Sequence, residues 1–339
     1  MKNILCVSHS IDFGNITLEN NLKNLFENDF DFYTFNKLDL NKRKTIIKQT
    51  SLLNRGILSL NLRKTLKKYS DKTILFNSIG PMTWAYGSYK MKNSILMIDW
   101  TRTLRNFFYK KKIKKDIAYI LQSHILKKIP KILCRTDSII ENLATCYGVK
   151  NSQMQRIPAP LNTEFFNIPP RPTPNKPRVL FIGVDFERKG GPVLINNLDL
   201  ILSKFDLTIA TKDKKADVKG VNFINNFLYA SPLHKKILSN HDIFIFPSKF
   251  DPYGMVIAEA ASAGMAIITT KGTLSSEELI QNETSGIIVN EPKDCISALL
   301  RLAENPSLID KFKHNIYKET HLNFSKERLK EIYLKIINN

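Results

Sequence analysis

Two carboxylates, Asp251 and Glu259, lie eight positions apart around a Pro-Tyr-Gly turn. The preceding segment Asp242–Phe246 is apolar enough for a short buried strand, and a helical pattern runs from Gly254 to about Ala263. An acid at the end of a strand and another in the next helix can face the same crevice. Carboxylates accept hydrogen bonds from sugar hydroxyls, and the free N–H groups of a helix N-terminus attract phosphate. The segment therefore predicts a site for a phosphorylated sugar, and the alternative is an ordinary strand–turn–helix with two surface acids.

A pair of cations lies upstream, in the segment Arg178–Gly191. Its pattern predicts a strand ending in Gly183, followed by a loop in which Arg188 and Lys189 precede two glycines. Arginine forks onto phosphate oxygens, lysine acts as a point charge, and glycine lets a backbone approach an anion closely. This loop is thus a second candidate for phosphate binding.

Strand–loop–helix units repeat from Arg178 to about Glu304, which is typical of a parallel sheet with helices on both faces. In such sheets ligands bind outside the carboxyl ends of the strands. The N-terminal half shows the same alternation. Its expected strands are Asn3–Val7, Thr73–Phe76, Ser94–Ile98 and Lys131–Cys134, and its expected helices include Leu18–Phe26 and Ile57–Tyr69.

Together, the two segments GVDFERKGG and FPSKFDPYGMVIAEAASAGMAIITTKGTLSSEELIQNETSGIIV resemble the C-terminal domain of glycosyltransferase family 4 (group 1). The family pattern is E-P-F-G, four residues, then E-A-x-A-x-G-x-P-V-I. The resemblance covers about 110 residues, Arg178 to Val289, and is much looser in the N-terminal half. It implies an α/β GT-B fold, with two Rossmann-like domains whose parallel sheets face each other across a cleft. It also implies a retaining transfer of a sugar from a nucleotide-diphosphate-sugar donor.

The resemblance also implies roles for individual residues. Lys189, with Arg188, would bind the donor diphosphate and stabilise the leaving group. Asp251 stands where the family's first Glu contacts the donor sugar, and Glu259 would accept hydrogen bonds from the ribose hydroxyls. The predicted catalytic residues are Arg188, Lys189, Asp251 and Asp99, and the predicted donor-binding residues are Gly14, Gly183, Arg188, Lys189, Asp251, Tyr253, Gly254, Met255, Val256 and Glu259.

The sequence departs from the family pattern at several positions. Asp251 is one methylene shorter than Glu, and Met265 replaces the usual Pro. The expected loop after the first strand, Ser8–Thr17, has one glycine, Gly14, where the family often has two. Many members also place a His in the N-terminal domain near the donor sugar, and the corresponding segment Phe76–Pro81 has none.

Asp99 follows the strand Ser94–Ile98 and is our candidate for the polar residue on the acceptor side. Its alternative role is to cap the following helix. The histidines, among them His234, show no pairing that predicts a catalytic or metal site. The only Asp-x-Asp, at Asp29 and Asp31, is placed where turn residues are expected, so we predict no metal and no cofactor beyond the nucleotide-sugar substrate.

Proline marks the domain boundary, because seven of the fifteen prolines fall between Ile157 and Pro177. Such a stretch favours extended backbone over helix interior or central strand. We therefore expect an N-terminal Rossmann-like acceptor-binding domain at 1–160, a Pro-rich linker at 161–177 and a C-terminal nucleotide-sugar-binding domain at 178–318. The segment 319–339 is expected to be a helix that crosses back to the first domain, as in the family.

Positive charge is concentrated in the first half, where residues 1–175 hold 29 Lys and Arg against 12 Asp and Glu. The segment Arg102–Lys128 alone has nine basic residues and one acid, with apolar residues at roughly helical spacing. A basic amphipathic helix of this kind is a candidate for an anionic membrane surface, and the alternative is a solvated face covering a core stripe. A nucleic-acid partner is not expected, because arginine is scarce in the segment and no nucleic-acid-binding motif is present.

The 339 residues, 43% hydrophobic and 24% charged, are typical of a globular protein with two domains. No apolar run is long enough to span a bilayer, no secretory signal is visible, and the four cysteines have no ligand spacing. We therefore expect a cytoplasmic protein, with the inner membrane face as a candidate location. The expected activity is glycosyl transfer to a glycan, lipid-linked or small-molecule acceptor. The alternatives are another GT-B activity, such as a nucleotide-sugar epimerase or phosphorylase, and a catalytically inert nucleotide-sugar-binding module.

Overall fold

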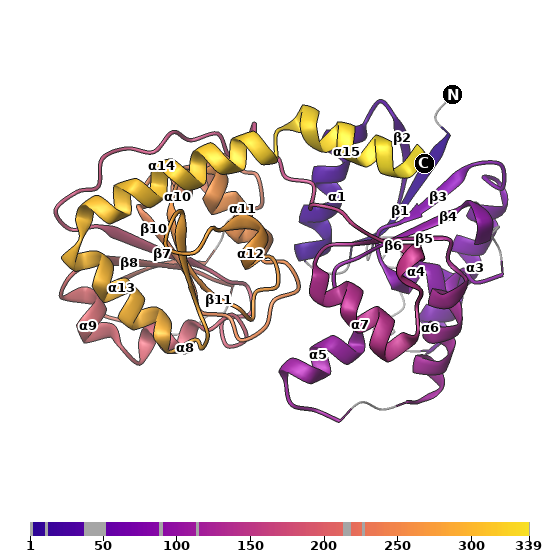
Figure 1. Cartoon of the computed structure of the whole chain (residues 1–339), viewed down its shortest axis with the longest axis horizontal. Coiled ribbons are helices and arrows are strands. Elements are labelled where there is room, and N and C mark those ends of the chain that lie inside the picture. Colours follow the sequence, from indigo (N-terminus) through magenta and orange to yellow (C-terminus); the bar gives the residue numbers. More distant parts are fainter. Residues whose placement is uncertain are drawn as a thin grey trace. The chain divides into compact units, whose positions relative to one another are not determined.

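The structure is a computed structural model that describes residues 3–10, 13–36, 52–87, 91–112, 115–212, 218–225 and 228–338 (Figure 1). The chain divides into two compact units. One comprises Met1–Pro160 together with Lys330–Asn339, and the other comprises Leu161–Leu329.

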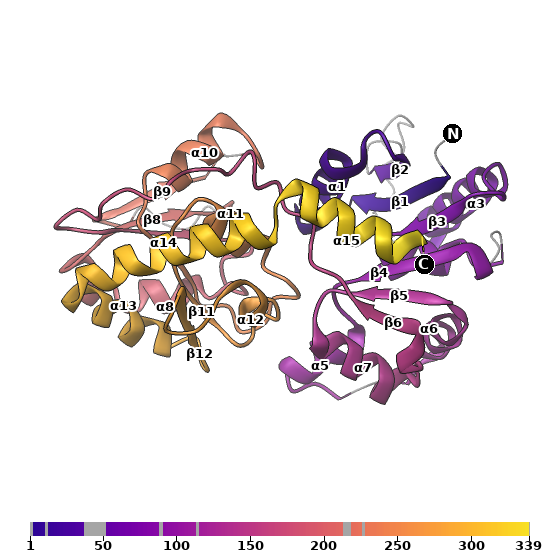
Figure 2. The same cartoon turned by 45° about the horizontal axis from the view of Figure 1, so that its top comes forward.

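The first unit is built on a parallel six-stranded sheet with the order β2-β1-β3-β4-β5-β6 (Figure 2). The strands are β1 (Ile4–Ser10), β2 (Phe30–Asn36), β3 (Thr73–Phe76), β4 (Ser94–Ile98), β5 (Lys131–Cys134) and β6 (Met154–Arg156). The surrounding helices are α1 (Phe13–Phe26), α3 (Leu52–Lys67), α4 (Ile79–Trp84), α5 (Arg102–Phe108), α6 (Ile117–Lys128) and α7 (Asp137–Tyr147), with 3-10 turns at Met91–Asn93 and Asn151–Gln153.

The second unit has its own parallel six-stranded sheet, with the order β12-β11-β10-β7-β8-β9. Its strands are β7 (Arg178–Ile182), β8 (Asp206–Ala210), β9 (Val221–Ile224), β10 (Ile243–Phe246), β11 (Ala266–Thr270) and β12 (Gly286–Val289). Its helices are α8 (Gly191–Ile195), α9 (Leu198–Leu202), α10 (Pro232–Ser239), α11 (Met255–Ser262), α12 (Ser276–Leu279), α13 (Asp294–Glu304) and α14 (Pro306–Asn323), and α15 (Lys326–Asn338) begins in this unit.

The central strands of both sheets are apolar because helices pack around them. Every residue of β4, β10 and β11 is buried, as expected for parallel strands that are covered on both faces. The expected α/β architecture of two parallel sheets is therefore confirmed, and three of the expected strands (β3, β4 and β5) have the predicted bounds.

Two expectations about the elements were wrong. The expected loop Ser8–Thr17 is short, because α1 begins at Phe13 and includes Gly14. The C-terminal segment 319–339 comprises the end of α14 and, from Lys326 onward, α15. The segment Arg102–Lys128 forms two helices instead of one.

The break between these two helices has a local cause. The Asp116 carboxylate caps α6 by accepting the Tyr119 N–H at 3.0 Å, and it also pairs with Arg102 at 2.8 and 2.7 Å. Lys110 has a positive φ of 51°. Like charges three or four positions apart disfavour a continuous helix through the lysine run.

The end of α15 contributes to the core of the first unit. Tyr333 is fully buried, stacks at an angle on Phe26, and its hydroxyl contacts Arg135 at 2.5 Å and the Pro158 carbonyl at 2.8 Å. No helix in the described part of the chain is long and apolar enough to cross a membrane.

Candidate functional site

Two loops of the second unit, which follow β7 and β10, meet at one edge of its sheet. The two strands are parallel neighbours, so their carboxyl ends lie together. Gly190, with a φ of 88°, packs so closely that a Cβ there would lie 1.9 Å from the Pro247 carbonyl oxygen. Only glycine fits this contact, which brings the cation pair predicted from sequence next to the carboxylate loop.

Asp251 organises the start of α11. Its Oδ1 accepts the N–H groups of Gly254 at 2.6 Å and Tyr253 at 3.2 Å, and its own N–H donates to the Gly272 carbonyl at 2.9 Å. The side chain is almost fully buried. Gly254 itself has a φ of 68°. Because its carboxylate binds these amides, the short side chain of Asp251 fixes the turn that precedes the helix.

Both predicted cations contact Asp251. The Lys189 ammonium forms an ion pair with Oδ2 and lies 5.2 Å above the Phe246 ring. The Arg188 guanidinium lies 4.0 Å from Oδ2 and also pairs with Asp185 at 2.9 Å. The structure thus brings together Arg188, Lys189 and Asp251, three of the side chains predicted from sequence.

Glu259 lies farther along α11 and has a different neighbour. Its Oε2 is 3.4 Å from Nε2 of His234, which belongs to α10. Both side chains are buried. Burial raises the pKa of Glu259 to about 8 and lowers the pKa of His234 to about 4, because each charged form loses its hydration.

The sequence showed no pairing for His234, and the structure places it beside Glu259. The two residues are 25 positions apart in the chain, and no sequence spacing links them. They meet because α10 leads into β10 and α11 follows β10.

The remaining predicted residues of the second unit lie in these same loops. Gly183 directly follows β7, and its N–H donates to the Ala210 carbonyl at 2.9 Å. Tyr253 is buried beside Asp251, while Met255 and Val256 form the first turn of α11 and are half-buried.

Gly14 and Asp99 belong to the other unit. Gly14 is part of α1, while Asp99 directly follows β4 and is half-buried. The cap of the next helix, α5, is Thr101, whose hydroxyl accepts the Leu104 N–H at 3.1 Å. The capping role considered for Asp99 is therefore performed by Thr101.

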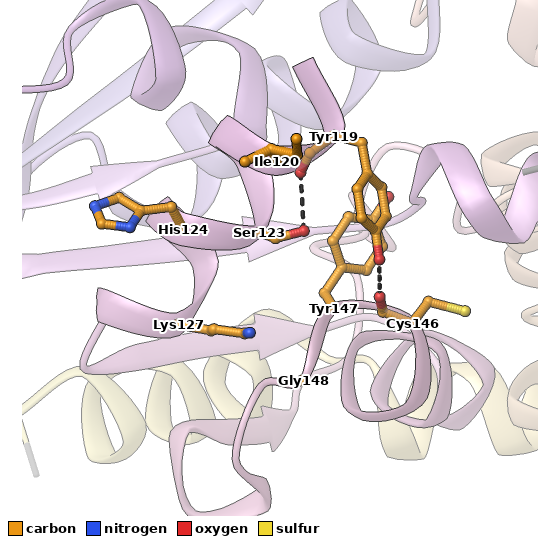
Figure 3. A pocket seen from close by; sticks show the side chains of 8 residues that line it. All are labelled: Tyr119, Ile120, Ser123, His124, Lys127, Cys146, Tyr147 and Gly148. Atoms are coloured by element: carbon orange, nitrogen blue, oxygen red, sulfur yellow. Dashed lines mark hydrogen bonds between the residues drawn. The ribbon is translucent and has the colours of Figure 1, made fainter. Parts of the chain in front are cut away.

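A pocket of about 390 Å³ lies between α6 and α7 of the first unit (Figure 3). The rings of Tyr119 and Tyr147 lie side by side in it, with centroids 5.1 Å apart, and the Ser123 hydroxyl donates to the Tyr119 carbonyl at 2.8 Å. None of the predicted site residues lines this pocket. Its lining is Tyr119, Ile120, Ser123, His124, Lys127, Cys146, Tyr147 and Gly148.

Within the described ranges, no group of three His, Cys, Asp or Glu side chains is arranged to hold a metal ion. The titratable groups that the site offers are two cations, two carboxyl groups and one neutral imidazole. Such a set, with the N-terminus of α11, suits an anionic, hydroxyl-rich ligand.

Comparison with known proteins gives a match between residues 176–305 and the family model of glycosyl transferases group 1. A protein named as glycosyltransferase 45 in Sulfolobus islandicus filamentous virus (isolate Iceland/Hveragerdi) is 21% identical over 131 residues. That alignment spans 38% of this chain and 37% of the viral protein.

Solved structures share the whole fold at low sequence identity. Sucrose-phosphate synthase (tll1590) from Thermosynechococcus elongatus has a TM-score of 0.76 at 17% identity, covering 100% of this chain and 98% of that one. Anabaena Alr3699/HepE in complex with UDP-glucose has a TM-score of 0.74 at 12% identity, covering 99% of each chain. WaaG, a glycosyltransferase involved in lipopolysaccharide biosynthesis, has a TM-score of 0.70 at 14% identity, again covering 99% of each chain. These likenesses show a GT-B fold, and the match to the group 1 family model lies within the second unit, at residues 176–305.

Proposed function

We propose that this protein is a retaining glycosyltransferase of family 4, which moves a sugar from a nucleotide-diphosphate-sugar donor to a glycan, lipid-linked or small-molecule acceptor. The observation that carries the proposal is the meeting of Arg188, Lys189 and Asp251 at the N-terminus of α11. The HepE structures hold UDP and UDP-glucose, so uridine diphosphate sugars are the first donors to test.

The proposed chemistry is mainly electrostatic. A departing diphosphate gains negative charge, which two cations and a helix N-terminus stabilise in a partly buried site. The ion pair with Asp251 holds the Lys189 ammonium near the turn that precedes α11. A bound diphosphate would share this ammonium with the carboxylate, and Asp251 would also face the donor sugar. Since the cations neutralise the leaving group, the proposal includes a metal-independent reaction.

The test is the release of nucleoside diphosphate from a panel of nucleotide sugars, in the presence of EDTA. We expect slow release by the unmodified protein and a loss of about 100-fold or more in Lys189→Ala, because one stabilising contact to the developing charge is removed. Lys204→Ala is the matched control, since Lys204 is an exposed lysine of the same unit and should leave the rate unchanged.

The alternative activities give different products in the same assay. A phosphorylase would release sugar phosphate only when inorganic phosphate is added, and an epimerase would convert the donor sugar without releasing the diphosphate. Tight donor binding with no product of any kind would identify an inert binding module. Any of these three results would overturn the transferase proposal.

We also propose that the first unit binds an anionic membrane surface through Arg102–Lys128. Phe107, Ile117, Ile120 and Leu121 are 72%, 85%, 61% and 40% exposed, so the alternative of a buried core stripe does not hold for these residues. Exposed lysines lie between the two helices, at 110, 111, 112 and 115. Proteins that bind a membrane surface insert apolar side chains at the boundary between headgroups and acyl chains. Their neighbouring cations bind the anionic headgroups. A cytoplasmic location stays a prediction.

Co-sedimentation with vesicles tests this second proposal. Binding to vesicles rich in phosphatidylglycerol should exceed binding to phosphatidylcholine vesicles. Changing the four lysines to Gln should weaken it by about 100-fold or more, at about 1 kcal/mol per charge. Ile117→Ser with Ile120→Ser should also weaken it, whereas Leu200→Ser, an exposed apolar residue of the other unit, should not. Equal binding by all variants would refute the proposal.

A further inference from the structure

The contact between His234 and Glu259 is enclosed by its surroundings. The imidazole is 2% exposed and packs edge-on against Phe166, with ring centroids 5.2 Å apart. The Tyr229 ring lies on another side, at 6.1 Å. The imidazole therefore has little freedom to turn away from the carboxylate.

The turn before α10 determines which ring nitrogen carries the proton. The Ala230 N–H donates to Nδ1 of His234 at 3.3 Å, so the proton of the neutral ring is on Nε2, the atom that faces Glu259. Ala230 adopts a φ of 51°, which is strained for a residue with a Cβ. The Ser231 hydroxyl accepts the His234 N–H at 3.1 Å and caps the helix. Backbone geometry thus holds both the ring and its tautomer.

We propose that His234 is a positioning residue for the ribose of the donor, because its Nε2 lies 3.4 Å from one oxygen of Glu259 and limits the orientations in which that carboxyl group can meet the ribose hydroxyls. This inference rests on the proposed function, in which Glu259 binds ribose. A buried carboxyl group accepts hydrogen bonds from hydroxyl groups best when its orientation is fixed. A neutral imidazole beside the carboxyl group can fix its orientation without adding a charge beside the diphosphate.

The test compares ribose and deoxyribose in the bound nucleotide. The ligand is whichever of UDP, GDP or ADP binds the unmodified protein most tightly in calorimetric titration, with its 2′-deoxy and 3′-deoxy analogues. The unmodified protein should prefer the ribonucleotide. In His234→Phe, which keeps a ring but has no N–H, we expect the affinity for the ribonucleotide to fall about tenfold and that for the deoxy analogues to stay unchanged.

His234→Gln is the rescue variant, because its amide keeps an N–H donor of similar reach, and it should recover most of the preference for ribose. In turnover assays, His234→Phe should raise the KM for the donor with kcat within about twofold, as expected when ground-state and transition-state binding weaken equally. A purely structural role would lower affinity for ribo- and deoxynucleotides alike.

The outcomes separate this inference from the function on which it rests. If the unmodified protein binds no nucleoside diphosphate, the proposed function fails. If it binds one and His234→Phe keeps the full preference for ribose, the positioning role of His234 is overturned while the proposed function stands. Melting curves establish that each variant is folded, and His234→Leu replaces His234→Phe if the bulkier ring prevents folding.

Discussion

At the residue scale, the site is marked by carboxylates and cations in low-polarity surroundings. Asp251 is buried, and its carboxylate forms an ion pair with Lys189 and accepts hydrogen bonds from backbone N–H groups. Glu259 is equally buried and has an imidazole as its neighbour, with a pKa raised to about 8. Groups whose pKa values depart this far from normal are common where ligands bind.

Glu259→Gln should change how stability depends on pH. The pKa of this carboxyl is about 8 in the folded protein, against an ordinary value of 4.5 for Glu. Below pH 4.5 both states are protonated, so the group has no effect. Between pH 4.5 and 8 only the unfolded chain ionises, so the free energy of unfolding falls by up to about 1.4 kcal/mol per pH unit.

Gln cannot ionise, so the stability of Glu259→Gln relative to the unmodified protein should increase from pH 4.5 to pH 8. Urea denaturation at a series of pH values measures this difference. A difference that is constant over the range would contradict the raised pKa. Glu277→Gln provides a control in the same unit, since Glu277 is an exposed residue of α12 and its variant should not show the trend.

At the scale of elements, two loops can meet because glycine occupies the point of contact. Gly190 lies against the Pro247 carbonyl, and this contact places Lys189 beside Asp251. The helix α11 can then begin at Met255, with Asp251 binding the N–H of Gly254, the residue that precedes the helix. Parallel pairing of β7 with β10 is what brings the two loops to the same edge.

Gly190→Ala should therefore destabilise the second unit strongly. The positive φ costs about 1–2 kcal/mol for any residue with a Cβ, and the clash with the Pro247 carbonyl adds to it, for a total of about 3 kcal/mol or more. Gly220→Ala is the matched control, because Gly220 has the same φ of 88° but faces the flexible end of the Leu202 side chain. Chemical denaturation of both variants should give the larger loss for Gly190→Ala, and equal losses would argue against the clash.

At the scale of the whole molecule, the chain forms two units, and the first is completed by the last residues of the sequence. Tyr333, Ile336 and Ile337 of α15 are buried in the first unit, and Lys330 pairs with Asp29 at 2.7 Å. The C-terminal end of α15 is therefore part of the core of the N-terminal unit.

Truncation after Leu329 tests this dependence. Loss of three buried apolar side chains should destabilise the first unit by on the order of 5 kcal/mol or more. Calorimetry should then show a lowered transition for the first unit and an unchanged one for the second. Lys330→Ala is the control, since an exposed ion pair contributes about 1 kcal/mol at most. If both transitions move to lower temperature together, the two units do not unfold independently.

The sequence by itself determined the local features of this protein. Apolar runs such as Thr73–Phe76 and Ser94–Ile98 became strands with the predicted bounds, because a strand buried on both faces needs an unbroken apolar segment. The start of α11 at Gly254 and the cation pair Arg188–Lys189 were likewise visible, since each depends on neighbours within a few positions.

Only the tertiary structure determined the pairings between distant segments. His234 reaches Glu259 because two helices flank the same strand, and Tyr333 reaches Phe26 across more than 300 residues of chain. It also determined that Ile117 and Ile120 are exposed, because helical spacing shows that a face is apolar but not what covers it. Periodicity is a local property of the chain, whereas burial depends on which other segments pack against it.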